Sequence, residues 1–201
     1  MVAHPSAVRL MLRVAQVVPR TESEGPGLRF AVWPQGCPLR CPGCCNPEML
    51  DPLGGTPVPV GQLIEAALAE PAIEGLTLLG GEPFFQAAAC AELCAGVRAH
   101  GLSVVIFSGY TLAELTAKGA DPEWSRLLTQ ADLLVDGRYE RARPETRRRF
   151  VGSQNQVLHF LTDRYSPSDP RVHGTNTVEI RLDRGALGVN GWPTLARRVL
   201  E

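Results

Sequence analysis

The sequence predicts an α/β fold in which a parallel sheet forms an incomplete, open β/α barrel. Strand-like apolar runs alternate with segments whose apolar residues recur at helical spacing, a pattern typical of parallel strands joined by right-handed crossovers. A complete eight-fold barrel takes about 250 residues, whereas this chain has 201 and spends many of them on loops. Three polar turns each follow a predicted strand, and the carboxyl ends of parallel strands meet at one rim.

Each element is predicted from its apolar run and the spacing within it. Short buried runs bounded by turn residues indicate strands, and apolar residues three or four positions apart indicate helices. The expected strands are Arg9–Val18, Leu28–Trp33, Gly75–Leu79, Leu102–Phe107, Ala131–Val135, Gln156–Leu161 and Thr177–Leu182. The expected helices are Val60–Glu70, Gln86–His100, a short one around Leu112–Lys118 and a closing one at Thr194–Leu200. We expect one domain at 1–201, with a core at about 10–182 and a C-terminal extension at 183–201.

The composition is that of a globular protein without bulk charge. Twenty basic and 21 acidic residues give a formal net charge of -1, which argues against nucleic acid as a partner. No apolar run approaches the roughly 20 residues of a membrane span. Arg9 and Arg13 interrupt the N-terminal apolar residues, which is unlike a signal peptide. We therefore expect a cytoplasmic protein whose six cysteines stay reduced.

Three cysteines in a long connection carry the strongest chemical signal. Cys37, Cys41 and Cys44 form C-x3-C-x2-C within residues 34–59, and a connection of this length is usually functional. A 4Fe-4S cluster normally takes four thiolates, so three would leave one iron open to a substrate. Structural zinc is the alternative, and the adjacent Cys45 would then have to be its fourth ligand.

The turns after three predicted strands supply candidate ligand-binding residues. GGEP (Gly80–Pro83) follows one strand, SGYT (Ser108–Thr111) follows the next, and Asp136 with Gly137 follows a third. Each turn also has a structural explanation, because Pro83 can open a helix, Thr111 can cap one and Asp136 suits a turn.

Two further features are better explained by structure than by chemistry. Cys90 and Cys94 stand four residues apart on a predicted helix and share its apolar face, so we expect them in the core and predict no second cluster. The segment from Arg138 to Phe150 holds six arginines in 13 residues. A solvated surface is the simpler interpretation, and a docking patch for an acidic partner or electron donor is the alternative.

Taken together, these motifs resemble those of the radical S-adenosylmethionine (SAM) enzymes. Their C-x3-C-x2-C signature matches Cys37, Cys41 and Cys44, and GGEP lies at the expected distance downstream. The resemblance narrows to the small activating enzymes of glycyl-radical enzymes through the stretches GPG (25–27), GCPLRCPGCCNPE (36–48), FSGYTLAEL (107–115), LLVDGRY (133–139) and GSQNQ (152–156). The positions on either side of the third cysteine often carry aromatic residues in such enzymes, and here they are Gly43 and Cys45.

The resemblance implies a fold, cofactors and site residues. It implies an open barrel of the radical SAM type, with a 4Fe-4S cluster held by Cys37, Cys41 and Cys44. The open iron of that cluster would chelate the methionine end of SAM, and one electron would cleave SAM to a 5′-deoxyadenosyl radical. The residues implied in SAM binding are Gly80, Gly81, Glu82, Pro83, Ser108, Gly109, Tyr110 and Asp136.

The resemblance also implies a reaction and partners. The radical would take a hydrogen atom from a glycine of a glycyl-radical enzyme, with anaerobic ribonucleotide reductase as the favoured partner class. A flavodoxin- or ferredoxin-like protein would donate the electron. The chain would then be a radical SAM oxidoreductase that acts as an activase. Two alternatives stay open at this point: a radical SAM enzyme that modifies a peptide or small metabolite, and a non-catalytic zinc-binding module.

Overall fold

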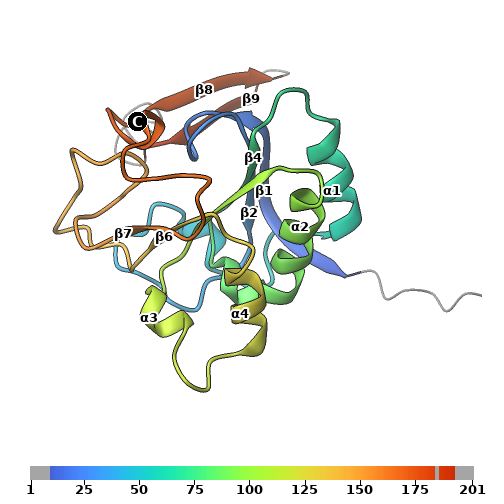
Figure 1. The fold of residues 1–201 in the computed structure, drawn as a ribbon, viewed down its shortest axis with the longest axis horizontal. Coiled ribbons are helices and arrows are strands. Elements are labelled where there is room, and N and C mark those ends of the chain that lie inside the picture. Colours follow the sequence, from blue (N-terminus) through green and yellow to red (C-terminus); the bar gives the residue numbers. More distant parts are fainter. Residues whose placement is uncertain (1–9, 184–185, 193–201) are drawn as a thin grey trace, which may run out of the picture.

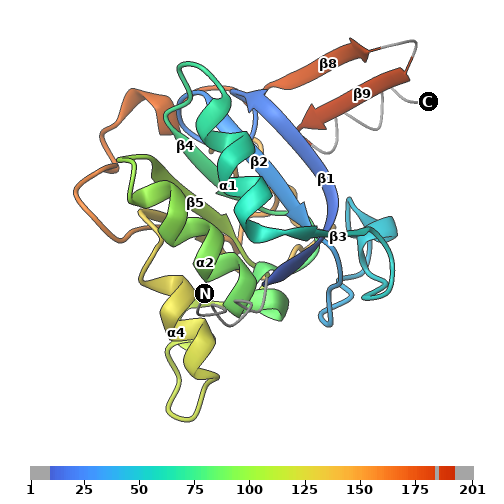
Figure 2. The same cartoon turned by 90° about the vertical axis from the view of Figure 1, so that its right-hand side faces the viewer.

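The computed structural model describes residues 10–183 and 186–192, which form one large sheet, a small sheet and four α-helices (Figures 1 and 2). The large sheet has the strand order β3-β1-β2-β4-β5-β6-β7, and β8 pairs with β9 in the small one. The strands are β1 Met11–Thr21, β2 Arg29–Pro34, β3 Thr56–Pro59, β4 Gly75–Leu78, β5 Ser103–Phe107, β6 Leu133–Asp136, β7 Val157–Phe160, β8 Val178–Asp183 and β9 Ala186–Gly191. The α-helices are α1 Val60–Ala69, α2 Ala87–Arg98, α3 Leu112–Leu115 and α4 Pro122–Leu128, and the 3-10 helices are η1 Pro47–Met49, η2 Pro83–Gln86 and η3 Pro170–Val172.

Four parallel strands form the middle of the large sheet. β2, β4, β5 and β6 pair in parallel in that order, which confirms an α/β fold with a largely parallel centre. The flanking strands differ from the all-parallel expectation, because β1, β3 and β7 join the sheet antiparallel. The loop at 22–28 between β1 and β2 explains part of this difference, since it is shorter than the dozen or so residues that a parallel crossover needs.

The main core lies between the large sheet and the helices (Figure 1). Side chains alternate between the two faces of a strand, so Val32 of β2 and Leu76 and Leu78 of β4 point toward the helices and are fully buried. Cys90 and Cys94 of α2 have no exposed surface in the same core, which confirms their predicted structural role. Each buried aliphatic side chain contributes about 1.5–3 kcal/mol to folding.

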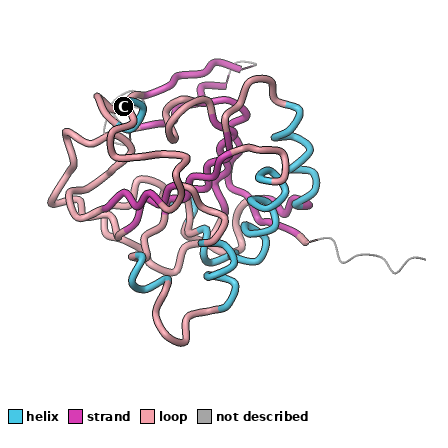
Figure 3. The backbone as a smooth tube through the Cα atoms, viewed as in Figure 1, coloured by secondary structure: helices cyan, strands magenta, loops and turns pink. Residues whose placement is uncertain are grey.

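The opposite face of the sheet is covered mainly by loops (Figure 3). Ala31 and Trp33 of β2 point to this side, where they pack in a small cluster with Val18, Met49 and Leu79. The apolar filling here is thinner than on the helix side, and this leaves room for a cavity.

Most predicted elements are present with shifted ends, and four differences stand out. The strand expected at Thr177–Leu182 pairs with β9 and not with the large sheet, and β9 itself was not expected. β3 lies inside the predicted connection at 34–59. Helix α4 was missed because it is short, although Asp121 caps it and Pro122 opens it. The helix expected at Thr194–Leu200 lies outside the described residues.

Within the part of the chain that the structure describes, no helix is long and apolar enough to cross a bilayer.

Arg29, at the start of β2, is a fully buried cation. Its guanidinium donates hydrogen bonds to the hydroxyls of Thr77, Ser103 and Tyr165 and to the carbonyls of Leu76 and Ser103. Burial lowers the pKa of Arg29, and the five hydrogen bonds offset much of the cost of placing a charge in the core. The residue therefore ties β2, β4 and β5 together at the end of the sheet away from the strand carboxyl ends.

We predict that Arg29→Met lowers the free energy of unfolding by about 2–4 kcal/mol, because two buried carbonyls lose their donor. Urea denaturation of the variant and the parent checks this value. Arg126→Met is the matched control, since Arg126 forms only exposed ion pairs with Glu92 and Glu123 and should lose less than about 1 kcal/mol. Equal losses in the two variants would contradict a special role for the buried arginine.

Candidate functional site

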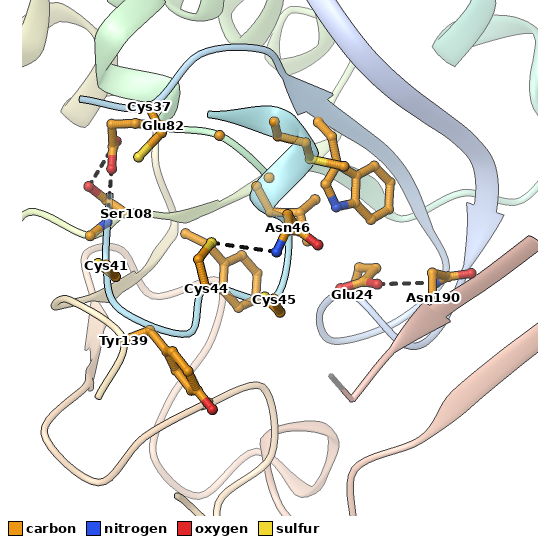
Figure 4. Close-up of a pocket in the computed structure, with 18 of the residues that line it drawn as sticks. Glu24, Cys37, Cys41, Cys44, Cys45, Asn46, Glu82, Ser108, Tyr139 and Asn190 are labelled. Atoms are coloured by element: carbon orange, nitrogen blue, oxygen red, sulfur yellow. Dashed lines mark hydrogen bonds between the residues drawn. The ribbon is translucent and has the colours of Figure 1, made fainter. Parts of the chain in front are cut away.

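A cavity of about 550 Å³ opens at the carboxyl ends of the parallel strands. Its wall includes Trp33 near the end of β2, the residues that follow β4 and β5, and Gly137 after β6. The three predicted ligands Cys37, Cys41 and Cys44 line this cavity, and so does the adjacent Cys45. The structure thus brings the cysteine loop and the polar turns to one rim, as the parallel topology predicts (Figure 4).

Backbone hydrogen bonds hold the cysteine loop in place. At its base, Gly36 N donates to Met49 O over 2.9 Å and Cys37 N to Leu50 O over 3.3 Å. Further along, Cys44 N donates to Cys41 O over 3.1 Å, and Asn46 N lies 3.4 Å from the Cys44 sulfur. The loop therefore curls around its own cysteines and presents them to the cavity.

The glycine at position 43 has a steric explanation. Gly43 adopts a φ of 75°, and a Cβ at this position would lie 2.8 Å from Cδ of Arg141. The positive φ favours glycine at this position, and the exposed Arg141 side chain packs beside it. Aromatic surfaces come instead from other segments, because the cavity wall includes Trp33, Phe107, Tyr139, Phe150 and Trp192.

The GGEP turn packs directly on the start of the cysteine loop. Gly81 N donates to Pro34 O over 3.0 Å and Glu82 N donates to Gly36 O over 2.9 Å. Gly80 has a φ of 100°, and a Cβ there would overlap the Trp33 ring. The turn can approach the loop this closely only because its two glycines carry no side chain.

Glu82 joins two strand ends and is itself buried. Its carboxylate accepts hydrogen bonds from the backbone N–H groups of Phe84 and Gly109 at 3.0 and 2.9 Å, and from the Ser108 hydroxyl at 3.0 Å. Burial raises the pKa of Glu82 to about 7. Glu82 and Ser108, both predicted to bind SAM, line the cavity and hydrogen-bond to each other across the turns after β4 and β5.

Three of the predicted ligand residues contact neighbouring elements of the fold. Pro83 is buried at the start of η2. The Tyr110 ring packs against Trp124, with the ring centroids 4.7 Å apart. Asp136 accepts a hydrogen bond from Leu112 N and lies 2.9 Å from His159 Nε2. These side chains are engaged by neighbouring elements, and their contact with SAM stays a prediction.

Three of the six arginines in the 138–150 segment form ion pairs within the chain. Arg138 forms two hydrogen bonds with Glu114, Arg143 pairs with Glu140, and Arg148 with Glu145. The Arg138 guanidinium holds the pKa of Glu114 at about 2. Arg141 and Arg147 are exposed, and Arg149 donates to the carbonyls of Arg171 and Glu22. The segment is therefore a partly ion-paired basic surface, and both interpretations of its sequence stay predictions.

Sequence reasoning missed the residues that close the far side of the cavity. Glu24, which lies just before the GPG stretch, is buried in the wall opposite Glu82 in the view of Figure 4. Its carboxylate accepts hydrogen bonds from Asn190 Nδ2 at 3.2 Å and from Gly191 N at 2.7 Å. Asn190 and Gly191 belong to β9, so no local pattern in the sequence pointed to this contact.

The buried carboxyl group of Glu24 should make the stability of the fold depend on pH. Burial raises the pKa of Glu24 from 4.5 to about 7, so the folded state binds more protons than the unfolded chain between these pH values. The free energy of unfolding therefore falls as the pH rises from about 4.5 to 7. Glu82 acts in the same direction.

We expect Glu24→Gln to remove on the order of 3 kcal/mol of this pH dependence. Urea denaturation of the metal-free protein at several pH values between 4.5 and 7 measures it. Gln keeps an oxygen that can accept from Asn190 and Gly191, so the hairpin contact should persist. An unchanged slope in the variant would show that Glu24 does not titrate in this range.

The donor set of the cavity fits an iron–sulfur cluster. Cys37, Cys41 and Cys44 belong to one loop, are free thiols and line one cavity. Thiolates are the protein ligands of a 4Fe-4S cluster, and each binds a different iron. Within residues 10–183 and 186–192, no group of three or more His, Cys, Asp or Glu side chains is arranged as a single-ion site.

The comparisons with known proteins agree with this site. A family described as 4Fe-4S single cluster domain matches residues 23–159. The chain is 32% identical to the anaerobic ribonucleoside-triphosphate reductase-activating protein of Vibrio cholerae, over 73% of this chain and 97% of the relative. A protein of the same name from Enterobacteria phage T4 is 30% identical, over 69% and 88%. The pyruvate formate-lyase-activating enzyme of Listeria monocytogenes is 28% identical, over 77% and 65%.

The fold and the cysteine-lined cavity define an iron–sulfur protein of the activating-enzyme class. The chain belongs to the 4Fe-4S single cluster domain family, together with the anaerobic ribonucleoside-triphosphate reductase-activating proteins. The predicted resemblance to the radical SAM activating enzymes is confirmed, as are the 4Fe-4S cluster and SAM as the cofactors of this class.

Proposed function

We propose that this chain is an activase that cleaves SAM at a 4Fe-4S cluster and installs a glycyl radical on an anaerobic ribonucleoside-triphosphate reductase. One observation carries the proposal: three cysteine thiols of one loop line a cavity whose wall also contains the turns after β4 and β5. The names of the relatives support the same reaction and partner. A flavodoxin- or ferredoxin-like electron donor and a cytoplasmic location, where thiols stay reduced, belong to the proposal.

In this proposal Cys37, Cys41 and Cys44 hold the cluster. When bound, the cluster would supply the electron that splits SAM into methionine and a 5′-deoxyadenosyl radical. Gly80 and Gly81 provide a backbone surface free of side chains next to the cysteine loop, where the amino acid end of SAM fits. A volume of about 550 Å³ lies within the range of roughly 300–1,000 Å³ that small-molecule sites occupy.

Glu82 acts as a positioning residue. Its three hydrogen bonds fix the turn after β4 against Ser108 and Gly109 after β5, so both turns face the cavity in one geometry. The aromatic wall supplies apolar faces for the adenine, in place of the aromatic residues that positions 43 and 45 lack.

The fold assignment is part of the same proposal. We interpret the large sheet as the open barrel of the radical SAM type, with antiparallel strands at both edges. We treat residues 1–201 as one domain in which 34–59 form the cluster loop and 183–201 the C-terminal extension. The cavity at the strand carboxyl ends supports this interpretation, because that end is where such folds bind ligands.

The proposal is tested with anaerobically purified protein, reconstituted with iron and sulfide and mixed with SAM, a reductant and the reductase of the same organism. We expect 5′-deoxyadenosine by chromatography and a glycyl-radical signal on the reductase by electron paramagnetic resonance. Cleavage of SAM without that signal would favour a peptide or small metabolite as the substrate. A colourless protein that retains one zinc would overturn the assignment.

A further inference from the structure

The β8–β9 hairpin forms part of the cavity wall although it lies outside the region matched by the family. That match ends at residue 159, whereas Val189, Asn190, Gly191 and Trp192 line the cavity. The hairpin projects from the body of the molecule next to the loop that follows β1 (Figure 2). This chain therefore builds one side of its site from a segment that the matched domain does not include.

One face of the hairpin is polar, and its side chains bind the hairpin to residues 20–24. Arg181 donates to Arg20 O over 3.0 Å, and Glu22 N donates to the Glu179 carboxylate over 2.7 Å. Asn190 donates to Thr21 Oγ1 over 3.0 Å and to Glu24. Glu179 and Asn190 are directly paired across the two strands, so these contacts come from the same face of the small sheet.

The other face of the hairpin is apolar and exposed. Ile180 pairs with Val189 and Leu182 pairs with Leu187 across the strands, so all four side chains share one face. Ile180, Leu182 and Leu187 are 56, 77 and 52% exposed. Val189 is one of the residues that line the cavity, so the apolar face begins at the cavity's edge. We call these four residues the apolar hairpin face.

The proposed reaction requires a segment of the partner protein to come close to the cavity and therefore to this face. A glycine in a protein chain can be attacked only if the segment carrying it enters the cavity. Glycine offers no side chain for recognition, so selectivity must come from contacts with the residues that flank it. An apolar surface that begins in the cavity wall and extends outward can make those contacts with apolar flanking residues.

We propose that the apolar hairpin face docks the glycine-bearing segment of the reductase through apolar residues flanking the glycine. This inference rests on the proposed function and names the surface that selects the partner. The polar face anchors the hairpin to residues 20–24, so docking occurs on a fixed surface next to the cavity.

The test is the double variant Ile180→Glu with Leu182→Glu, in the full-length, cluster-loaded protein. We expect its dissociation constant for the reductase to rise at least about tenfold, because two charges would be buried against apolar residues. Fluorescence anisotropy of the labelled reductase measures binding without relying on catalysis. Visible absorbance confirms that the variant holds its cluster. Leu68→Glu is the matched control, since Leu68 is an exposed apolar residue of α1, away from the cavity, and should leave binding unchanged.

The outcomes separate this inference from the function on which it rests. If the parent protein cleaves SAM but does not bind the reductase, the partner assignment fails and the docking proposal fails with it. If the parent binds and activates the reductase and the double variant does so equally well, only the docking proposal is overturned. A parent dimer that the double variant converts to a monomer, with reductase binding unchanged, would assign the face to a second copy of this chain. Unchanged binding in the variant together with altered binding after truncation at residue 192 would assign it to the chain's own C-terminal residues.

Discussion

Replacement of Cys41 by alanine is expected to abolish SAM cleavage, with a loss of at least about 1,000-fold in 5′-deoxyadenosine formation. The variant removes one of three thiolates, and a cluster held by two protein ligands is not retained. Cys41 is the best position for this test because its backbone oxygen, which accepts the hydrogen bond from Cys44 N, remains in alanine. The loop should therefore keep its turn while losing the ligand. Iron content per chain and visible absorbance report the loss of the cluster independently of activity.

Two other cysteines provide the controls. Cys90→Ala removes a buried thiol from the α2 core, and we expect about 1 kcal/mol less stability with the cluster retained. Cys45→Ala removes the fourth thiol of the cavity wall and should also retain the cluster. The ligand assignment is wrong if the Cys45 variant loses its iron while the Cys41 variant keeps it. Loss of iron in all three variants would indicate general instability.

The second large effect is expected from Gly81→Ala. A Cβ at this position would lie 2.5 Å from Gly36 O and 2.6 Å from Pro34 O, and both are backbone atoms that cannot rotate away. The turn after β4 would have to move off the start of the cysteine loop, and it would lose the hydrogen bonds from Gly81 N and Glu82 N. A displacement of about 1 Å in a positioned site costs on the order of 100-fold in rate. We therefore expect about 100-fold slower SAM cleavage.

Gly61→Ala controls for the change itself, because no atom lies within 4 Å of a Cβ placed at Gly61 in α1. This variant should keep full activity and gain a few tenths of a kcal/mol or more in stability. Thermal unfolding and iron content show whether the Gly81 variant is folded and loaded. Normal activity in a folded, loaded Gly81 variant would show that contact between the GGEP turn and the cysteine loop is not needed for the reaction.

The local sequence was enough to predict the parallel centre of the fold and the 4Fe-4S class of the site. β2, β4, β5 and β6 are short apolar runs that end in recognisable turns, and their alternation with helices implies parallel pairing. The spacing of Cys37, Cys41 and Cys44 and the GGEP turn lie within short stretches, so a local pattern carries them. The convergence of these motifs on one rim also follows, because topology places the carboxyl ends of parallel strands together.

The hydrogen-bond partners of single polar side chains could not be predicted from these local sequence patterns. Glu82 and Ser108 were predicted to face a ligand; both line the cavity, and they also bond to each other because the turns after two neighbouring strands meet. Tyr110 and Asp136 also follow strands, and the structure adds contacts that the sequence did not predict: Tyr110 packs against Trp124, and Asp136 accepts a hydrogen bond from the first residue of α3. A strand end brings a residue to the rim, while the neighbouring elements decide which way its side chain points.

The sequence by itself determined the class of protein, because cluster ligation and backbone turns depend on residues close together in the chain. The tertiary structure alone decided how the cavity is closed. Glu24 and Asn190 are 166 residues apart, and their contact depends on the β8–β9 hairpin folding back on the loop after β1. Such a contact leaves no periodic trace in the sequence, since it is made by single polar atoms that meet only after both elements are packed.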